Sequence, residues 1–141
     1  AAMKSTVVVQ LYENDLSGPI PQFSSQSLEL LHLDENALTQ SIPNIGGSTV
    51  TEIRLEQNKL SGSIPVELSQ HTNLGLLWLH ANDLTGEVPD ELGQLTSLVS
   101  LRLEGNKLIG EVPDAVCDLR QVHQLSTLRA TCASSNSGLI C

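Results

Sequence analysis

The chain has 141 residues, enough for one domain with its own core, but contains only one Trp, one Tyr and one Phe, so leucine must build a core of repeated layers. The formal net charge of −9 disfavours a nucleic-acid partner, because an acidic chain repels phosphate backbones, and favours a basic protein or peptide at long range. No apolar run approaches the ~20 residues of a membrane-spanning helix, so this segment is not expected to insert into a bilayer.

An asparagine recurs along the chain at an almost constant spacing. The copies, 22, 22, 24 and 24 residues apart by subtraction, are Asn14, Asn36, Asn58, Asn82 and Asn106. Each follows a pair of aliphatic residues in alternate positions and precedes a leucine by two residues. An aliphatic–proline pair closes each copy, and a glycine stands two residues before that pair except in the second copy, which has Gln40. A fixed period of this length predicts a solenoid.

The alternating aliphatic residues predict one short strand in every copy, with its apolar side facing the core. Successive strands are expected to stack as a parallel sheet, and each asparagine amide to bond backbone groups that the turn leaves unpaired. Because proline fixes φ and cannot donate to a sheet, the return side is expected to be extended or 3₁₀, with little regular α-helix. No single copy can bury its own leucines, so the stack must bury them together.

The last part of the chain departs from this pattern. Val122, Leu125 and Leu128 continue a strand-like row, but Ala130 stands where the asparagine is due. This departure predicts a cap that closes the solenoid at its C-terminal end.

All three cysteines lie in the last quarter of the chain, which indicates a stapled terminus in an oxidising compartment. Two pairings are open. A Cys132–Cys141 disulfide, the preferred one, would pin the tail onto the last turn and leave Cys117 free. A Cys117–Cys132 disulfide would instead tie the cap to the fifth turn.

The pattern Leu-x-x-Leu-x-Leu-x-x-Asn-x-Leu-x-Gly-x-Ile-Pro resembles the plant-type extracellular leucine-rich repeat over roughly residues 6–122. The resemblance implies an α/β-type, right-handed solenoid with a parallel β-sheet on its concave face. It also implies a single domain over residues 1–141, with about five repeats in 6–121 and a C-terminal cap in 122–141. That cap resembles those of diatom and algal repeat proteins. On this resemblance we expect the chain to lack the cysteine-paired N-terminal cap common in plant-type proteins.

The same resemblance implies a non-enzymatic function outside the cell. The expected partner is a protein, a peptide or a cell-wall glycan, bound by a secreted protein or by a receptor ectodomain at the cell surface. An inhibitor of a cell-wall-degrading enzyme is an alternative, since an acidic concave face would fit a basic enzyme.

Side chains between the inward aliphatic residues should point outward on the concave face, in columns about 4.8 Å apart. Trp78 then lies between Arg54 and Arg102, whose guanidinium groups can stack on the indole. This composition is typical of an interface hot spot. The plainer alternative pairs Arg54 with Glu56 and Arg102 with Glu104, so that Trp78 only covers the sheet. The predicted ligand-binding residues are Tyr12, Leu30, His32, Asp34, Arg54, Glu56, Leu76, Trp78, His80, Arg102 and Glu104.

Other functional classes have weaker sequence support. No nucleophile elbow, phosphate-binding glycine loop or metalloprotease helix occurs, so no catalytic residue and no cofactor is predicted. His32, Asp34, Glu56 and His80 fall in neighbouring columns but follow no metal-ligand motif, so no metal site is predicted. Binding of ice or another ordered surface is a further alternative. It rests on a regular column of mostly hydroxyl side chains: Ser17, Thr39, Ser61, Thr85 and Ile109.

Overall fold

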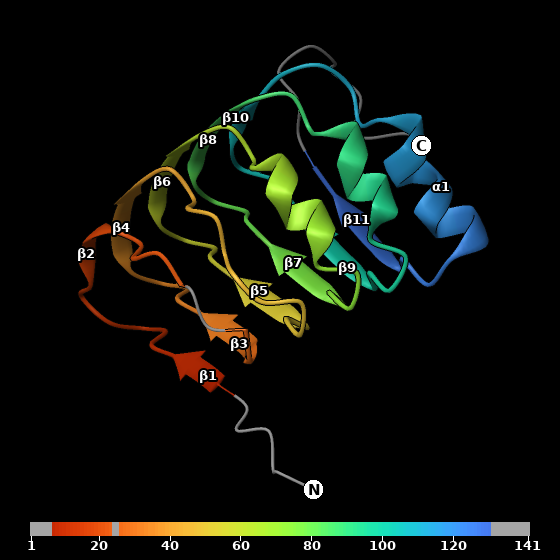
Figure 1. Cartoon of the computed structure of the whole chain (residues 1–141). Helices are drawn as coiled ribbons and strands as arrows, with labels where there is room; N and C mark the ends of the chain where they lie inside the picture. The colour runs from red at the N-terminus through yellow and green to blue at the C-terminus, as the bar shows by residue number, and fades with distance from the viewer. Residues whose placement is uncertain (1–6, 24–25, 131–141) are drawn as a thin grey trace, which may run out of the picture.

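In the computed structural model, which describes residues 7–23 and 26–130, the chain winds into a solenoid whose turns lie side by side (Figure 1). The turns contribute one strand each to a six-stranded parallel sheet, called the concave sheet below. This sheet is the one that the alternating aliphatic residues predict. Its strands, in spatial order, are Val7–Gln10 (β1), Leu28–His32 (β3), Glu52–Arg54 (β5), Leu76–Trp78 (β7), Ser100–Arg102 (β9) and Thr127–Arg129 (β11).

The register of the concave sheet keeps equivalent residues of successive turns side by side. Arg54 pairs with Trp78, and Trp78 pairs with Arg102. The aliphatic neighbours of these residues point to the opposite side, as the twofold alternation of a strand requires. They are fully buried and form a continuous ladder through the core: Leu31, Ile53, Leu77 and Leu101.

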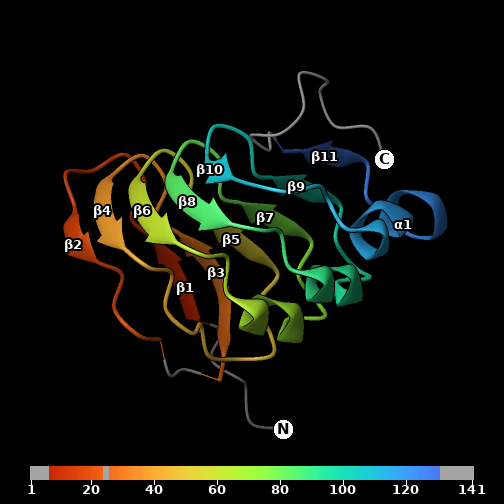
Figure 2. The ribbon, with the colours of Figure 1, turned by 90° about the horizontal axis from the view of Figure 1, so that it is seen from above.

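A second parallel sheet lies beside the first, and the sequence did not predict it (Figure 2). Its strands form just after the repeat asparagine of each turn. Glycines with positive φ, such as Gly62 and Gly86 (φ 79°), end these strands. Gln40 adopts the same conformation (φ 67°) without being a glycine. In spatial order the strands are Lys107–Leu108 (β10), Asp83–Gly86 (β8), Lys59–Gly62 (β6), Ala37–Gln40 (β4) and Ser17–Pro19 (β2).

The repeat asparagines tie each turn to its neighbour. The Asn82 amide donates to the carbonyl oxygens of Leu55 (2.9 Å) and Leu79 (3.2 Å), in the preceding turn and in its own. The Leu60 backbone N–H donates to Asn82 Oδ1 at 2.9 Å. Asn36, Asn58 and Asn106 accept an equivalent backbone N–H from the preceding turn. The predicted role of the asparagine is therefore confirmed.

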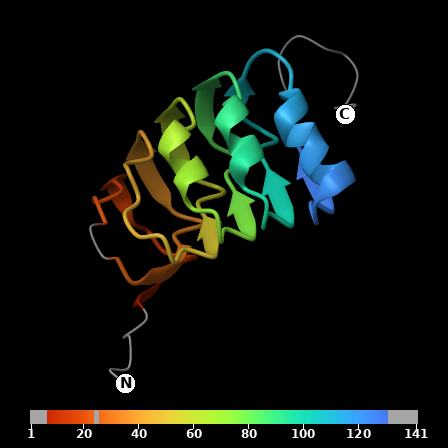
Figure 3. The same cartoon turned by 45° about the vertical axis from the view of Figure 1, so that its right-hand side comes forward.

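The return side is helical in the later turns, where Figure 3 shows coiled segments side by side. They are the 3₁₀ helices η1 (Val66–Gln70) and η2 (Asp90–Gln94) and the α-helix α1 (Asp114–Val122). A proline caps the start of each, with φ between −59° and −65°. The 3₁₀ segments agree with the expected extended or 3₁₀ return side, and proline can start each helix because it is well tolerated where a helix begins.

The first turns cross the return side differently because they are shorter. Phe23 and Ile45 form an isolated parallel bridge there in place of a helix. Ile45 is buried and Phe23 packs against the core, so these side chains fill the layer that Leu68 and Leu92 fill in the later turns.

The C-terminal end continues the concave sheet. β11 pairs with β9, and Leu125 is buried before it. Val122 does not join a strand-like row as predicted, because it ends α1 and is 73% exposed. Cys117 is disulfide-bonded, which contradicts its expected free state. A bonded Cys117 does not fit the Cys132–Cys141 pairing, which leaves Cys117 free. Because Cys132 and Cys141 lie outside the described residues, the Cys117–Cys132 pairing stays a prediction.

Candidate recognition surface on the concave sheet

Trp78 lies at the centre of the outward face of the concave sheet and is half-buried. The guanidinium carbon of Arg54 is 4.7 Å from the centroid of the indole, and that of Arg102 is 5.4 Å from it. The indole N–H donates to Ser100 Oγ at 2.9 Å. These contacts hold the ring in one orientation, so the predicted Arg–Trp–Arg arrangement is present.

The plainer alternative paired Arg54 with Glu56 and Arg102 with Glu104, and only the second of these pairs is present. Arg102 donates through Nε to Glu104 Oε1 at 2.8 Å, as expected. Arg54 instead lies 3.5 Å from Glu52, and no ion pair with Glu56 occurs. Arg54 is therefore shared between Glu52 and Trp78.

His32 is part of this network but is much less accessible than the sequence suggested. Its ring nitrogen Nε2 is hydrogen-bonded to Glu52 Oε2 at 3.0 Å, and Gln10 Nε2 lies 3.4 Å from the other ring nitrogen, Nδ1. Only 6% of the residue is exposed. A position between the inward residues of a strand is thus not always open, because neighbouring long side chains can cover it.

The side chains described so far lie in one row across the strands, which we call the Trp78 row: Gln10, His32, Arg54, Trp78 and Arg102. A second row runs beside it, just past the ends of the strands. We call it the acidic row; its members are Asp34, Glu56, His80 and Glu104. Backbone hydrogen bonds continue past the strands at this level, for example from Gln57 N–H to the carbonyl oxygen of His80 at 3.1 Å. The row therefore has the same regular spacing as the strands, and His80 meets the Trp78 ring edge-on at 6.1 Å between centroids.

Glu56 is the most buried member of the acidic row, with 5% of its surface exposed. Burial, reinforced by the nearby Asp34 carboxylate, raises the pKa of Glu56 from 4.5 to about 7. Burial and the charge of Arg102 lower the pKa of His80. Glu56 is therefore about half protonated near neutral pH, and His80 remains neutral there.

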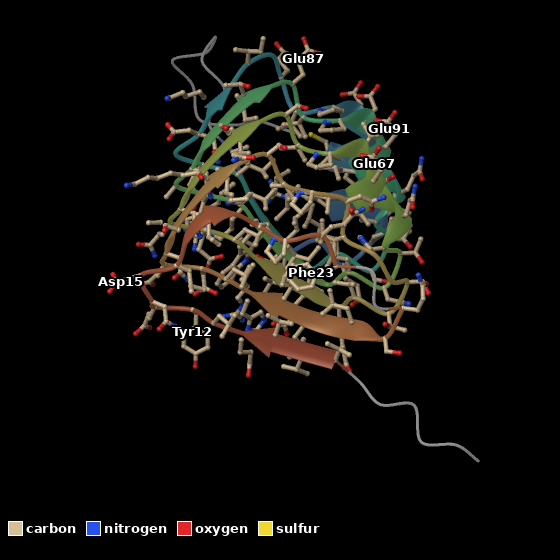
Figure 4. The ribbon with its side chains drawn as sticks, turned by 60° about the vertical axis from the view of Figure 1, so that its left-hand side comes forward. Tyr12, Asp15, Phe23, Glu67, Glu87 and Glu91 are labelled. Atoms are coloured by element: carbon tan, nitrogen blue, oxygen red, sulfur yellow. The ribbon has the colours of Figure 1, made fainter. Side chains whose placement is uncertain are left out.

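The remaining predicted residues lie at the borders of these rows. Leu30 and Leu76 are half-buried and flank Glu52 in the register, which gives apolar surface next to the charged groups. Tyr12 follows β1 at the end of the acidic row and is 48% exposed. Figure 4 shows Tyr12 well apart from Glu91, which lies on the helical side of the molecule.

Arg129 is a member of the Trp78 row that the sequence did not reveal. It pairs with Arg102 in the register of β11 and β9 and is exposed. The available signal was the repeated Leu-Arg pair, Leu101-Arg102 and Leu128-Arg129. The irregular spacing and the missing asparagine at Ala130 hid it.

The other sequence-based hypotheses gain no support from the fold. Within residues 7–23 and 26–130, no group of three His, Cys, Asp or Glu side chains could hold a metal ion. The Ser/Thr column is out of register, because Thr39 pairs with Pro19 and Lys59 rather than with Ser17 and Ser61. In the same described part of the chain, no helix has the length and apolar character that crossing a membrane requires.

The geometry defines a repeat solenoid that offers one broad side-chain surface for recognition, and comparison with known proteins supports this class. A family model for the leucine-rich repeat matches residues 97–119. A comparison with curated protein sequences finds no match.

Several solved structures from Arabidopsis thaliana are similar to the chain. A chain of the BIR3–SERK2 complex is 30% identical with a TM-score of 0.71, and the match covers 87% of the present chain and 68% of that one. The HAESA ectodomain with a peptide hormone is 34% identical with a TM-score of 0.77, and the match covers 87% of the present chain but 21% of HAESA. The BIR2 ectodomain is 28% identical with a TM-score of 0.69, covering 75% and 58% respectively.

The chain belongs to the leucine-rich repeat family, in the form found in the extracellular domains of plant receptors.

Proposed function

We propose that this domain recognises a protein or peptide on its concave sheet, with Trp78 at the centre of the contact. The observation that carries the proposal is the half-buried indole held between Arg54 and Arg102. An aromatic ring that is already oriented loses little conformational entropy on binding, and its remaining apolar surface gains from being covered. Trp and Arg are also the residue types that most often dominate interface energies.

The similar structures support the same class of partner. The HAESA ectodomain is in complex with the peptide hormone IDA, and BIR3 is in complex with SERK2. We infer by analogy that the present chain works outside the cell, as part of a receptor ectodomain or as a secreted protein. A cell-wall glycan, or a cell-wall-degrading enzyme that the domain inhibits, would use the same surface.

A display selection tests the proposal and supplies the ligand at the same time. The biotinylated domain is panned against a random peptide library, and the selected peptides are titrated into the wild type and into Trp78→Ala. We expect the substitution to weaken binding by about thirtyfold or more, which corresponds to the ~2 kcal/mol of an interface hot spot.

The matched control is Glu91→Ala in η2, an exposed position on the helical side that should leave affinity unchanged. Circular dichroism of each variant confirms that the fold is retained. Selected peptides that bind Trp78→Ala as tightly as the wild type, or that depend on Glu91, would refute the concave sheet as the recognition surface.

A further inference from the structure

The acidic row contains more hydrogen-bond acceptors than the protein itself satisfies. Asp34 Oδ1, Glu56 Oε2 and Glu104 Oε2 are all buried and have no hydrogen-bond partner, and the same is true of two nearby nitrogens, Arg54 Nε and His80 Nδ1. Leaving a buried polar atom unpaired costs about 1–3 kcal/mol, and more when the group is charged. Three such oxygen atoms in one row are able to accept hydrogen bonds from a ligand.

The Asp34 end of this row differs from the Glu104 end. Glu104 uses its other oxygen to bind Arg102. In the described part of the chain, neither Asp34 nor Glu56 forms an ion pair. Arg54 is near enough to favour the ionised form of Glu56, but its guanidinium is directed to Glu52 and the Trp78 ring. Two adjacent carboxyl groups therefore lack a cation of their own.

We propose that Asp34 and Glu56 form a subsite for the cationic side chain of an arginine or lysine in the bound peptide. The inference rests on the proposed function, since it names one feature of the ligand that the concave sheet would bind. A guanidinium fits best, because its planar fork can donate to two carboxyl groups at once.

The surroundings of the subsite are consistent with this occupant. Asp34 is only half-buried, so a ligand would reach the pair from its side. The proposal requires Glu56, which is 5% exposed, to turn its carboxyl group outward to engage the cation. The Tyr12 ring, 48% exposed at the adjacent position of the row, offers a surface for the apolar stem of the side chain. The net charge of −9 attracts a basic peptide at long range.

Because Glu56 is buried, the affinity of the subsite for a cation should depend on pH. Because its pKa is about 7, the carboxyl group must lose a proton before it can pair with a cation. Between about pH 6 and about pH 8 its ionised fraction rises roughly tenfold, and affinity for a cationic side chain should rise with it. The charged groups that act on Glu56 are Asp34, Arg54 and Arg102, and the acidic row continues beyond it with His80 and Glu104.

The test uses a blocked pentapeptide with a central arginine and the same peptide with citrulline, a neutral isostere. Backbone amide shifts of the ¹⁵N-labelled domain are followed during each titration. We expect saturable shifts around residues 34 and 56 for the arginine peptide, with a Kd of about 1 mM as is usual for one isolated contact. The citrulline peptide should bind about tenfold more weakly or not at all.

Glu56→Gln is the decisive variant, because it keeps the shape of the side chain and removes its charge. The substitution should lower the affinity for the arginine peptide about tenfold and abolish the rise of that affinity with pH. Glu91→Gln is the control and should behave as the wild type. Asp34→Asn provides the same test if Glu56→Gln fails to give a folded spectrum.

The inference is overturned if the citrulline peptide binds equally well, if Glu56→Gln leaves affinity and its pH dependence unchanged, or if no saturable shift occurs up to about 10 mM peptide. None of these results refutes the proposed function, which depends on the loss of selected ligands in Trp78→Ala. Loss of binding in Trp78→Ala with none in Glu56→Gln would retain the recognition surface and remove only the cationic subsite.

Discussion

The buried Glu56 carboxyl group predicts how stability depends on pH. Its pKa in the folded chain is about 7, against an ordinary value of 4.5. Below the lower value the group is protonated in both states and adds no pH dependence. As pH rises towards the higher value, the unfolded chain releases the proton while the folded chain keeps it, so stability falls. At about 1.4 kcal/mol for each pH unit, the full loss reaches about 3 kcal/mol.

The measurement is the free energy of unfolding in urea for wild type and Glu56→Gln at about pH 5 and about pH 8. Glutamine imitates the protonated carboxyl group at both pH values. The variant should therefore gain up to about 3 kcal/mol relative to the wild type on going to the higher pH. His71 and His80, whose pKa values burial lowers, oppose this trend, but they are present in both proteins and cancel in the difference. A difference that is the same at both pH values would refute the reasoning.

Three further predictions concern the scaffold, all measured by urea denaturation. Asn82→Ala should lower the free energy of unfolding by about 3 kcal/mol, because it leaves several buried backbone groups unpaired. Asn14→Ala should lower it by only about 1 kcal/mol, since Asn14 donates only within its own turn, and equal losses would contradict the role of the asparagines in joining the turns. Gln40→Gly should stabilise the fold by up to about 1 kcal/mol by relieving the positive φ of 67°, and a clear loss would contradict this. Gly93→Ala should destabilise it by about 1–3 kcal/mol, because the new Cβ would lie 2.7 Å from Ala115 Cβ in α1, and unchanged stability would show that α1 can shift away.

Much of the scaffold is predictable because each repeat position has one physical task. The period-two aliphatic residues correctly predicted the concave sheet, and the asparagine predicted the bonds between turns. The second sheet was missed because its strands contain Ser, Thr, Gly and Lys and have no apolar alternation of their own. Its strands arise from the stacking of whole turns, which no single stretch of sequence encodes.

The candidate site was predictable only in part. The register placed Trp78 between two arginines as expected, since spacing alone determines that arrangement. Burial within a row was not predictable from spacing: His32, which is hydrogen-bonded to Glu52 of the next turn, and Glu56 are both almost inaccessible to solvent. The same limit applies to Arg54, whose choice of Glu52 over Glu56 depends on side-chain directions that the spacing does not specify.

Fluorescence of Trp78 tests the central claim most directly, because it is the only tryptophan in the chain. A selected peptide without tryptophan is titrated while both the emission of Trp78 and the heat of binding are recorded. If the concave sheet is the recognition surface, the emission should shift to shorter wavelength as the ring is covered, with the same Kd as calorimetry. Calorimetric binding that leaves the emission of Trp78 unchanged would contradict the account.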